Sequence, residues 1–169
     1  LAGVLNIQNA TGLGSTVGGT TVAAGAALEV EGGIAVAEAI TLNGTGVSGG
    51  GALRNVSGSN NINGAITLAS DTRINNADPD FVDQLVISGG IAGANTNLTV
   101  GGVGTSHVAS SIATGSGTLT KDGGGGLFLS GGNTFTGATT INGGNLTVAN
   151  GGALSDTALV TIGASTFLG

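Results

Sequence analysis

The sequence of 169 residues contains no cysteine, tryptophan, tyrosine or methionine, and only four phenylalanines. The absence of cysteine excludes disulfide bonds, thiolate nucleophiles and cysteine-ligated zinc. Because aromatic side chains are so scarce, any core must be assembled from Leu, Ile, Val and Ala in thin layers that resemble one another. Backbone pairing and close packing alone must hold such a protein together.

Charge is also scarce: 7% of the residues are charged, with nine acidic and three basic side chains and a net charge of -6. This balance repels phosphate backbones, so we expect no nucleic-acid partner. No stretch approaches the roughly 18 consecutive apolar residues of a membrane span. The chain starts at Leu1 with neither Met nor a basic leader, which predicts a fragment of a longer protein.

What the sequence has in abundance is glycine, with 36 residues, together with 40% apolar residues and a mean hydropathy of +0.42. Disordered chains have low hydropathy and high net charge, which argues against disorder here. Glycine weakens regular elements unless tight turns recur, so an apolar and glycine-rich chain indicates many short strands.

Short triplets with two apolar residues around a polar or small one recur along the chain, and each is a strand signal of period two. Gly or Asn follows most of them, as expected for turns. Residues 34–40 also have large apolar side chains two apart, which predicts a strand rather than a helix. The triplets start at Leu5, Leu28, Ile40, Ile66, Leu85, Leu98, Leu127, Leu146 and Val160.

We expect the apolar residues of these triplets to point into the interior of a stack of strands. The predicted inward residues are Leu28, Val30, Ile40, Leu42, Ile66, Leu68, Leu127, Leu129, Leu146 and Val148.

Spacing indicates an internal repeat. Triplets start at residues 66, 85 and 98, and again at 127, 146 and 160, so steps of 19 and 13 are followed by steps of 19 and 14. Residues 3–9 also resemble residues 144–150 at an offset of 141, which predicts that the chain starts and stops at the same phase of a long repeat. Such repeats are typical of solenoids, here with roughly 20 to 25 residues per rung and about seven or eight rungs.

An antiparallel sandwich is the alternative β architecture, since Asn-Gly pairs at residues 43, 63, 142 and 150 are typical of hairpins. The strands are short, however, and glycine interrupts them every few residues, which favours a coil that turns corners. We therefore predict one all-β domain over residues 1–169, a right-handed parallel β-helix or β-solenoid with Gly- and Asn-rich turns and no helical domain.

Residues 115–148 read GSGTLTKDGGGGLFLSGGNTFTGATTINGGNLTV. This segment resembles the autotransporter-associated β-strand repeat, also called the passenger-associated transport repeat, and residues 19–100 resemble the segments that link such repeats. Phe135, Gly126 and Asn145 depart from the commoner Tyr, Thr and Thr of that pattern. The resemblance implies a right-handed parallel β-helix passenger that is exported to the bacterial cell surface through a C-terminal outer-membrane β-barrel.

Two motifs superficially indicate catalysis or phosphate binding. Ser48 lies in a Gly-x-Ser-x-Gly pattern and could pair with His107, the one histidine of the chain, but the glycines that follow Ser48 start a helix poorly. Residues 123–126 resemble a phosphate loop, but Lys121 precedes the glycines instead of following them, so we expect a solenoid corner. We predict that the chain is not an enzyme.

Three further patterns could carry chemistry. Asp78, Asp80 and Asp83 place oxygen ligands near one another, but we expect a protruding polar loop around Pro79 and no metal or cofactor. Glu29 and Glu31 should share an outward face, as glycosidase acids do, but without a basic neighbour. The frequent threonines resemble the flat arrays of ice-binding proteins, yet their spacing looks too irregular for one ladder, and β-propensity explains them.

These observations favour a structural and adhesive segment of a surface-exposed, extracellular autotransporter passenger that supports export, folding and stalk formation. Its partners are then the neighbouring repeats, the β-barrel of the parent, and an unknown receptor. The alternatives are a self-associating extracellular filament or biofilm matrix subunit and, less favoured, a β-helix enzyme acting on glycans. Because the sequence shows no capping helix, the ends of the fragment should also associate.

Overall fold

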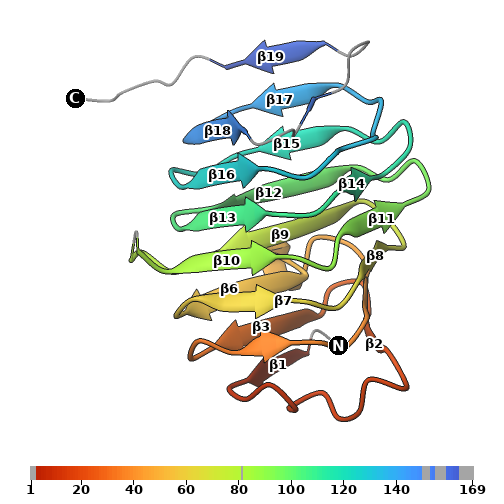
Figure 1. Ribbon diagram of the computed structural model, residues 1–169, viewed down its shortest axis with the longest axis vertical. Coiled ribbons are helices and arrows are strands. Elements are labelled where there is room, and N and C mark those ends of the chain that lie inside the picture. Colours follow the sequence, from red (N-terminus) through yellow and green to blue (C-terminus); the bar gives the residue numbers. More distant parts are fainter. Residues whose placement is uncertain (1–2, 81, 150–152, 155–158, 164–169) are drawn as a thin grey trace.

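The computed structural model describes residues 3–80, 82–149, 153–154 and 159–163, and it is a stack of short parallel strands. In Figure 1 the strands at the front run from left to right, and those behind run from right to left while the chain climbs. That path is a right-handed coil of about seven turns. The predicted right-handed parallel β-solenoid is confirmed.

Three parallel sheets form the walls of the solenoid. Sheet A comprises β1 (Val4–Ile7), β3 (Ala27–Glu31), β6 (Leu53–Ser57), β9 (Thr72–Asn76), β12 (Leu98–Gly102), β15 (Leu119–Lys121), β17 (Thr139–Ile141) and β19 (Val160–Ile162). Sheet C comprises β4 (Ala35–Val36), β7 (Asn60–Ile62), β10 (Gln84–Ile87), β13 (Thr105–Val108), β16 (Gly126–Leu129) and β18 (Asn145–Val148). Sheet B comprises β2 (Thr20–Val22), β5 (Ile40–Leu42), β8 (Ile66–Leu68), β11 (Ile91–Gly93) and β14 (Ile112–Ala113).

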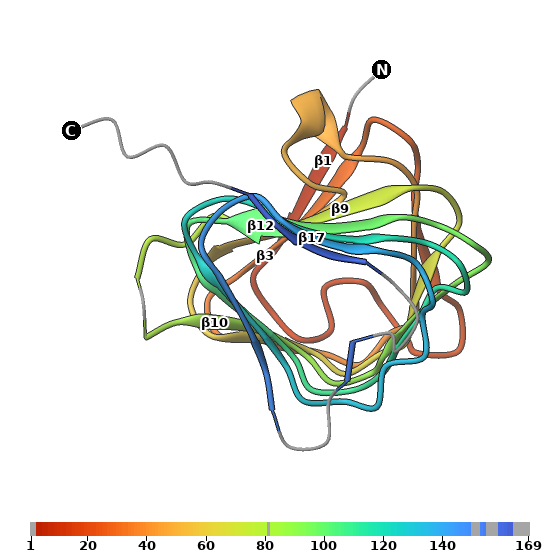
Figure 2. The ribbon, with the colours of Figure 1, turned by 90° about the horizontal axis from the view of Figure 1, so that it is seen from above.

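Each regular turn of the coil contributes one strand to each sheet, and the strands stack around one interior (Figure 2). Register partners in sheet A lie between 20 residues apart, as in Leu119 and Thr139, and 26 residues apart, as in Thr72 and Leu98. All pairings between the described strands are parallel, so the antiparallel sandwich is wrong. Asn43-Gly44 turns a corner after β5 instead of closing a hairpin, and Gly44 has a φ of 74°.

The interior is one continuous core, made mainly of aliphatic side chains, that runs along the stack of rungs. Eight of the ten predicted inward residues are buried. Leu146 is only half-buried, and Val148 is 37% exposed. Val148 still lies in the inward column, as the register partner of the buried Leu129, and it is exposed because β18 is the last strand of sheet C in the described residues, where no further rung covers it.

All nine predicted triplets lie in strands, but the pattern missed those strands whose inward side chains are polar or small. Residues 34–40 are not one strand, since β4 ends at Val36 and the chain turns before β5 begins at Ile40. The only helical element in the described residues is the 3-10 turn Val47–Gly49, which projects from the wall in Figure 2. No helix in the described part of the chain is long and apolar enough to cross a membrane.

The phase inferred from the sequence repeat is wrong. Residues 3–9 contain β1 of sheet A, whereas residues 144–149 contain β18 of sheet C, and Asn150 lies outside the described residues. Likewise, the triplets at 66, 85 and 98 belong to sheets B, C and A, but those at 127, 146 and 160 belong to sheets C, C and A. Similar Leu-x-Val sequences occur in both sheet A and sheet C, as in β12 and β18, so similarity between two strands does not fix their phase.

Buried asparagines hold the corner between sheets A and C. Asn60 accepts a hydrogen bond from the N–H of Ile34 (2.7 Å) and donates to Asn55, which in turn donates to Asn76 (2.9 Å). All three asparagines are fully buried. Because the next rungs satisfy each amide, this network ties successive corners together.

Glycine is required where the corners of adjacent rungs touch. Gly102 has a φ of 110°, and a Cβ at this position would collide with the backbone oxygen of Asn76 on the rung below. We expect Gly102→Ala to lower the free energy of unfolding by more than about 1 kcal/mol, because an L side chain is strained there. Gly124→Ala is the matched control, since a Cβ at this nearby corner position meets no atom; equal urea midpoints for the two variants would contradict this account of the corner.

Candidate functional site

Charged side chains gather on the outer face of sheet A. Arg54 forms an ion pair with Glu29 on the rung below it. Arg73 holds Asp122 through both guanidinium nitrogens, at 2.6 and 2.8 Å. These are the two salt bridges of the described residues, and each links different rungs: the first joins β6 to β3, and the second joins β9 to the corner after β15.

Glu29 and Glu31 share the outward face of β3, as the alternation of the strand predicted. The side chains of Asn6 and Gln8 both donate to the Glu31 carboxylate, at 3.2 Å each. The expectation that no basic residue lies near this pair is wrong, because Arg54 contacts Glu29. The two acids therefore belong to a network of polar contacts between neighbouring rungs.

Threonines form in-register ladders on two outer faces. Thr99, Thr120, Thr140 and Thr161 are successive partners on sheet A. Thr21, Thr41 and Thr67 are successive partners on sheet B. The expectation of irregular spacing is wrong, because the loops between strands absorb differences in rung length and leave the register intact.

Ser48 and His107 lie on different parts of the solenoid. Ser48 is in the 3-10 turn between β5 and β6, with a φ of 52°, whereas His107 is on β13 of sheet C. The imidazole of His107 contacts the hydroxyl of Ser130 instead, with Nε2 and Oγ 2.7 Å apart. No carboxylate hydrogen-bonds to His107 in the described residues, so a complete triad is lacking there.

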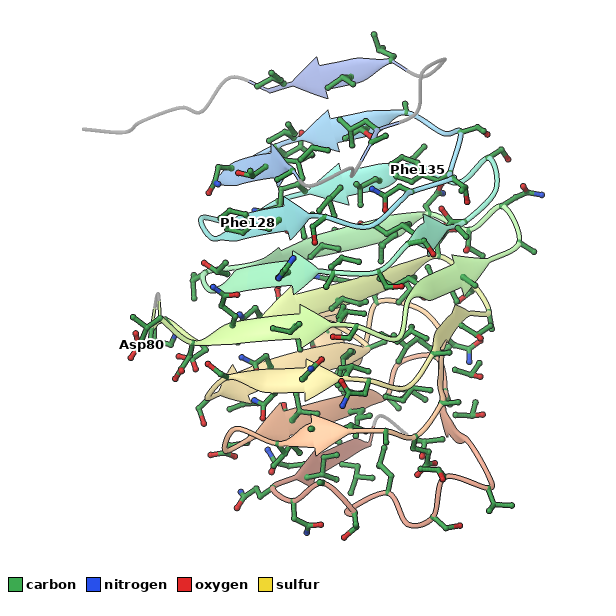
Figure 3. All side chains as sticks on the ribbon, in the orientation of Figure 1. Asp80, Phe128 and Phe135 are labelled. Atoms are coloured by element: carbon green, nitrogen blue, oxygen red, sulfur yellow. The ribbon has the colours of Figure 1, made fainter. Side chains whose placement is uncertain are left out.

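His107 lines a shallow hollow of about 200 Å³ on the outer face of sheet C, together with Gln84, Ser130 and Phe128. Phe128 is 39% exposed on this outer face (Figure 3), and its ring meets the imidazole edge to face, with centroids 6.5 Å apart. The hollow offers an aromatic surface and a few polar atoms to a ligand. It provides no arrangement that would activate Ser130 beyond the single contact with His107.

Asp78, Asp80 and Asp83 lie in the acidic loop between β9 and β10. This loop protrudes from the wall, and Asp80 lies at its tip (Figure 3). Asp78 is nevertheless buried, and its carboxylate accepts hydrogen bonds from the N–H groups of Gly58 and Asp80. Asp83 accepts a hydrogen bond from the Ser59 hydroxyl; Phe81 lies outside the described residues. No group of three metal-ligating side chains occurs in the described parts of the chain, and each aspartate stabilises the backbone or a neighbouring rung.

Lys121 is a buried charged residue whose inward position the sequence pattern did not predict. The strand alternation places it inward, and it is 1% exposed, in the column that holds Val100 below and Ile141 above. Its ammonium donates to the carbonyls of Asp122, Gly123 and Gly143, at 2.6 to 3.1 Å. Residues 122–125 are the corner between β15 and β16, so Lys121 satisfies the carbonyls of this corner and of the next one.

The stability of the protein should rise with pH because of Lys121. Burial lowers the pKa of Lys121 below its ordinary value of 10.5, the nearby Asp122 carboxylate opposes that shift, and Arg73 adds to it. Between the lowered pKa and 10.5 the unfolded chain binds more protons, so deprotonation favours the folded state as the pH rises through this window. Lys121 is the one lysine, and the chain has no Tyr or Cys, which makes the effect measurable by denaturant unfolding at several alkaline pH values. Lys121→Met should abolish the rise; an identical rise in the variant would contradict the assignment.

The contacts that sequence reasoning missed join residues one or two rungs apart. His107 and Ser130 are separated by 23 positions, and Arg73 and Asp122 by 49. A search for polar pairs at separations of one rung would have found the first, but the lengths of the individual loops decide which residues meet.

Comparison with known families identifies one segment. A family model described as the passenger-associated transport repeat matches residues 119–148, which confirms the resemblance first seen over residues 115–148. The segments over 19–100 lie outside the matched residues. Searches of curated proteins and of solved structures found no match.

Proposed function

We propose, from the passenger-associated transport repeat at residues 119–148, that the chain is a structural and adhesive segment of a bacterial autotransporter passenger. It supports passenger export, folding and stalk formation at the cell surface. The observation that carries this proposal is the repeat itself, which occupies β15 to β18 and adds rungs to the solenoid without a break in register.

The matched residues supply both a core and the contacts to the rungs around it. Leu119, Leu127 and Leu129 are buried in the interior, and Phe135 packs beside them where sheet B has no strand on that turn (Figure 3). Each rung buries its apolar side chains against the previous one, so the fold can grow locally once a first rung exists. This property suits a chain that crosses a membrane unfolded and folds outside it.

The location follows from the same repeat: a passenger is extracellular or exposed at the cell surface. The partner in export is the C-terminal outer-membrane β-barrel of the parent protein. The outer faces offer surfaces for adhesion, namely the polar face of sheet A and the uncharged threonine face of sheet B.

Surface display tests the proposal. The chain is expressed in front of the outer-membrane barrel of an autotransporter, and a protease added outside the cells reports export. We expect display of the wild type and of Phe128→Asp, because the Phe128 side chain points outward. Display of Leu127→Asp should be weak, because the side chain of Leu127 is fully buried. Retention of the wild type inside the cell, or equal display of all three proteins, would overturn the proposal.

The proposed role is not catalytic. Ser48 and His107 lie apart, and the acids of sheet A and of the acidic loop are occupied by structural hydrogen bonds. We expect the purified chain to hydrolyse neither simple esters nor glycans. Turnover that disappears in His107→Ala or Ser130→Ala would contradict this expectation, and it would locate the activity at the hollow on sheet C.

A further inference from the structure

The hollow on the outer face of sheet C lies within the stack of rungs. Its two central strands are paired on both sides, β13 with β10 and β16, and β16 with β13 and β18. Phe128 and His107 are register partners on these two strands. The exposure of Phe128 therefore results from the outward direction of its side chain and not from a missing rung.

The Phe128 ring is held in place from two sides. The His107 imidazole meets it edge to face from the rung below, and the contact between Nε2 and the Ser130 hydroxyl, at 2.7 Å, fixes that imidazole in turn. Along the strand, a Cβ on Gly126 would lie 3.6 Å from the Phe128 ring, so the ring lies against this glycine. A side chain that is fixed before binding loses little conformational freedom when a ligand covers it.

Polar but uncharged groups border the aromatic ring. Gln84 from β10 offers an amide that can donate and accept, and the Ser130 hydroxyl can form hydrogen bonds beyond its contact with His107. None of the described residues that line the hollow is an acid, a lysine or an arginine. The net charge of -6 on the whole chain also disfavours an anionic ligand. The hollow therefore suits a neutral ligand that combines an apolar face with hydroxyl groups.

The size of the hollow limits the ligand to a single ring. Pockets for drug-sized ligands measure about 300 to 1,000 Å³, whereas this hollow measures about 200 Å³. A pyranose ring carries C–H groups on its faces and hydroxyl groups around its rim. The C–H groups can lie on the electron-rich face of Phe128, while the hydroxyl groups reach the polar atoms of Gln84 and Ser130.

We propose that this hollow binds one neutral pyranose unit of a glycan, stacked on Phe128. Gln84 and Ser130 form hydrogen bonds to its hydroxyl groups, and His107 positions the aromatic ring. This inference rests on the proposed adhesive function, for which it names the ligand class, and it adds a defined site on sheet C to the faces of sheets A and B. Weak binding of one unit is sufficient where many copies face a glycan-covered surface, because multivalency raises the overall avidity.

Saturation-transfer nuclear magnetic resonance on the purified chain tests the site. The probes are the methyl glycosides of glucose, galactose, mannose and N-acetylglucosamine, with glucuronate as the anionic comparison. We expect saturation of the aromatic protons to pass to the ring protons of at least one methyl glycoside, with a dissociation constant on the order of 1 mM for a single ring. The signals of His107, the one histidine of the chain, should shift during the same titration, and glucuronate should give much weaker transfer.

Substitutions at the hollow locate the bound sugar. Phe128→Leu keeps an apolar side chain but removes the ring, and it should weaken binding by more than about tenfold. Gln84→Leu should weaken binding less and reduce the discrimination among the four glycosides. Val103→Ala is the matched control, because Val103 is exposed (51%) at the corner between β12 and β13 and does not line the hollow; it should bind as the wild type does.

Three results would overturn the proposal. They are no transfer to any of the four glycosides, equal transfer in the wild type and in a folded Phe128→Leu variant, and binding of acetyl-proline amide or acetyl-tryptophan amide in place of the sugars, which would indicate a peptide site. Circular dichroism verifies that each variant is folded.

Display on cells separates this inference from the proposed function. Phe128→Leu should be exported as the wild type is, because the side chain points outward, yet it should lose the sugar. A displayed chain that binds none of the glycosides would overturn the sugar site alone. A chain that is not displayed, but binds a glycoside when purified, would overturn the passenger role and leave the site in place.

Discussion

Leu68→Asp is expected to unfold the solenoid around β8 and to lower its stability more than any exposed substitution. Leu68 is 2% exposed in the inward column of sheet B, between Leu42 and Gly93. Truncation of a buried leucine alone costs about 2 to 5 kcal/mol, and an unpaired carboxylate in an apolar interior adds a desolvation penalty. Because a whole domain is stable by only about 5 to 15 kcal/mol, we expect loss of the folded signal in far-ultraviolet circular dichroism.

Thr67→Asp is the matched control for this prediction. Thr67 precedes Leu68 on the same strand, but its side chain points outward and is exposed. Surface substitutions usually change stability by no more than about 0.5 kcal/mol. Similar losses in the two variants would show that β8 does not alternate between interior and solvent as described.

Asn60→Ala is expected to lower the free energy of unfolding by about 2 to 4 kcal/mol, since it leaves several buried groups without partners. The substitution removes the acceptor for the buried N–H of Ile34 and the donor to Asn55 and to the corner carbonyls of Ser57 and Gly58. Each buried polar group left without a partner costs about 1 to 3 kcal/mol. Urea unfolding monitored by circular dichroism measures the change.

Asn61→Ala tests whether the effect of Asn60 depends on its buried network. Asn61 is the next residue of β7, points outward, and accepts one hydrogen bond from Ser88. We expect its replacement to have little effect on stability. A loss as large as that of Asn60→Ala would mean that β-propensity in this strand matters more than the corner network.

The sequence predicted the walls of the solenoid better than it predicted its sites. Apolar triplets such as Ile66-Thr67-Leu68 follow the alternation of a strand, and glycine marks the corners, so the fold class and most inward residues could be inferred. Strands such as β7 and β9 escaped because polar residues take some of their inward positions, namely Asn60 in β7 and Thr72 and Asn76 in β9. Buried asparagine is stable there only because another rung supplies its hydrogen bonds, which a local pattern does not reveal.

The candidate sites are formed by contacts between side chains on different rungs. The sequence offers no direct signal for such contacts. His107 meets Ser130 rather than Ser48, and Lys121 lies inside the stack, although lysine is rarely buried. Rung lengths vary between 20 and 26 residues, so an error of a few residues changes the pairing of every side chain. Because of the same variation, the similarity between residues 3–9 and 144–150 at an offset of 141 does not place the two segments at the same phase of the coil.

The register of the parallel rungs is tested most directly by two spin labels on Thr120→Cys and Thr140→Cys, since the chain has no other cysteine. These residues are register partners on the outer face of sheet A, on strands about 4.8 Å apart. We expect strong dipolar broadening of the electron paramagnetic resonance spectrum, which denaturant abolishes. The control pair Thr120→Cys and Thr147→Cys lies on sheets A and C and should show much weaker broadening. A native spectrum of the first pair without broadening would contradict the parallel solenoid.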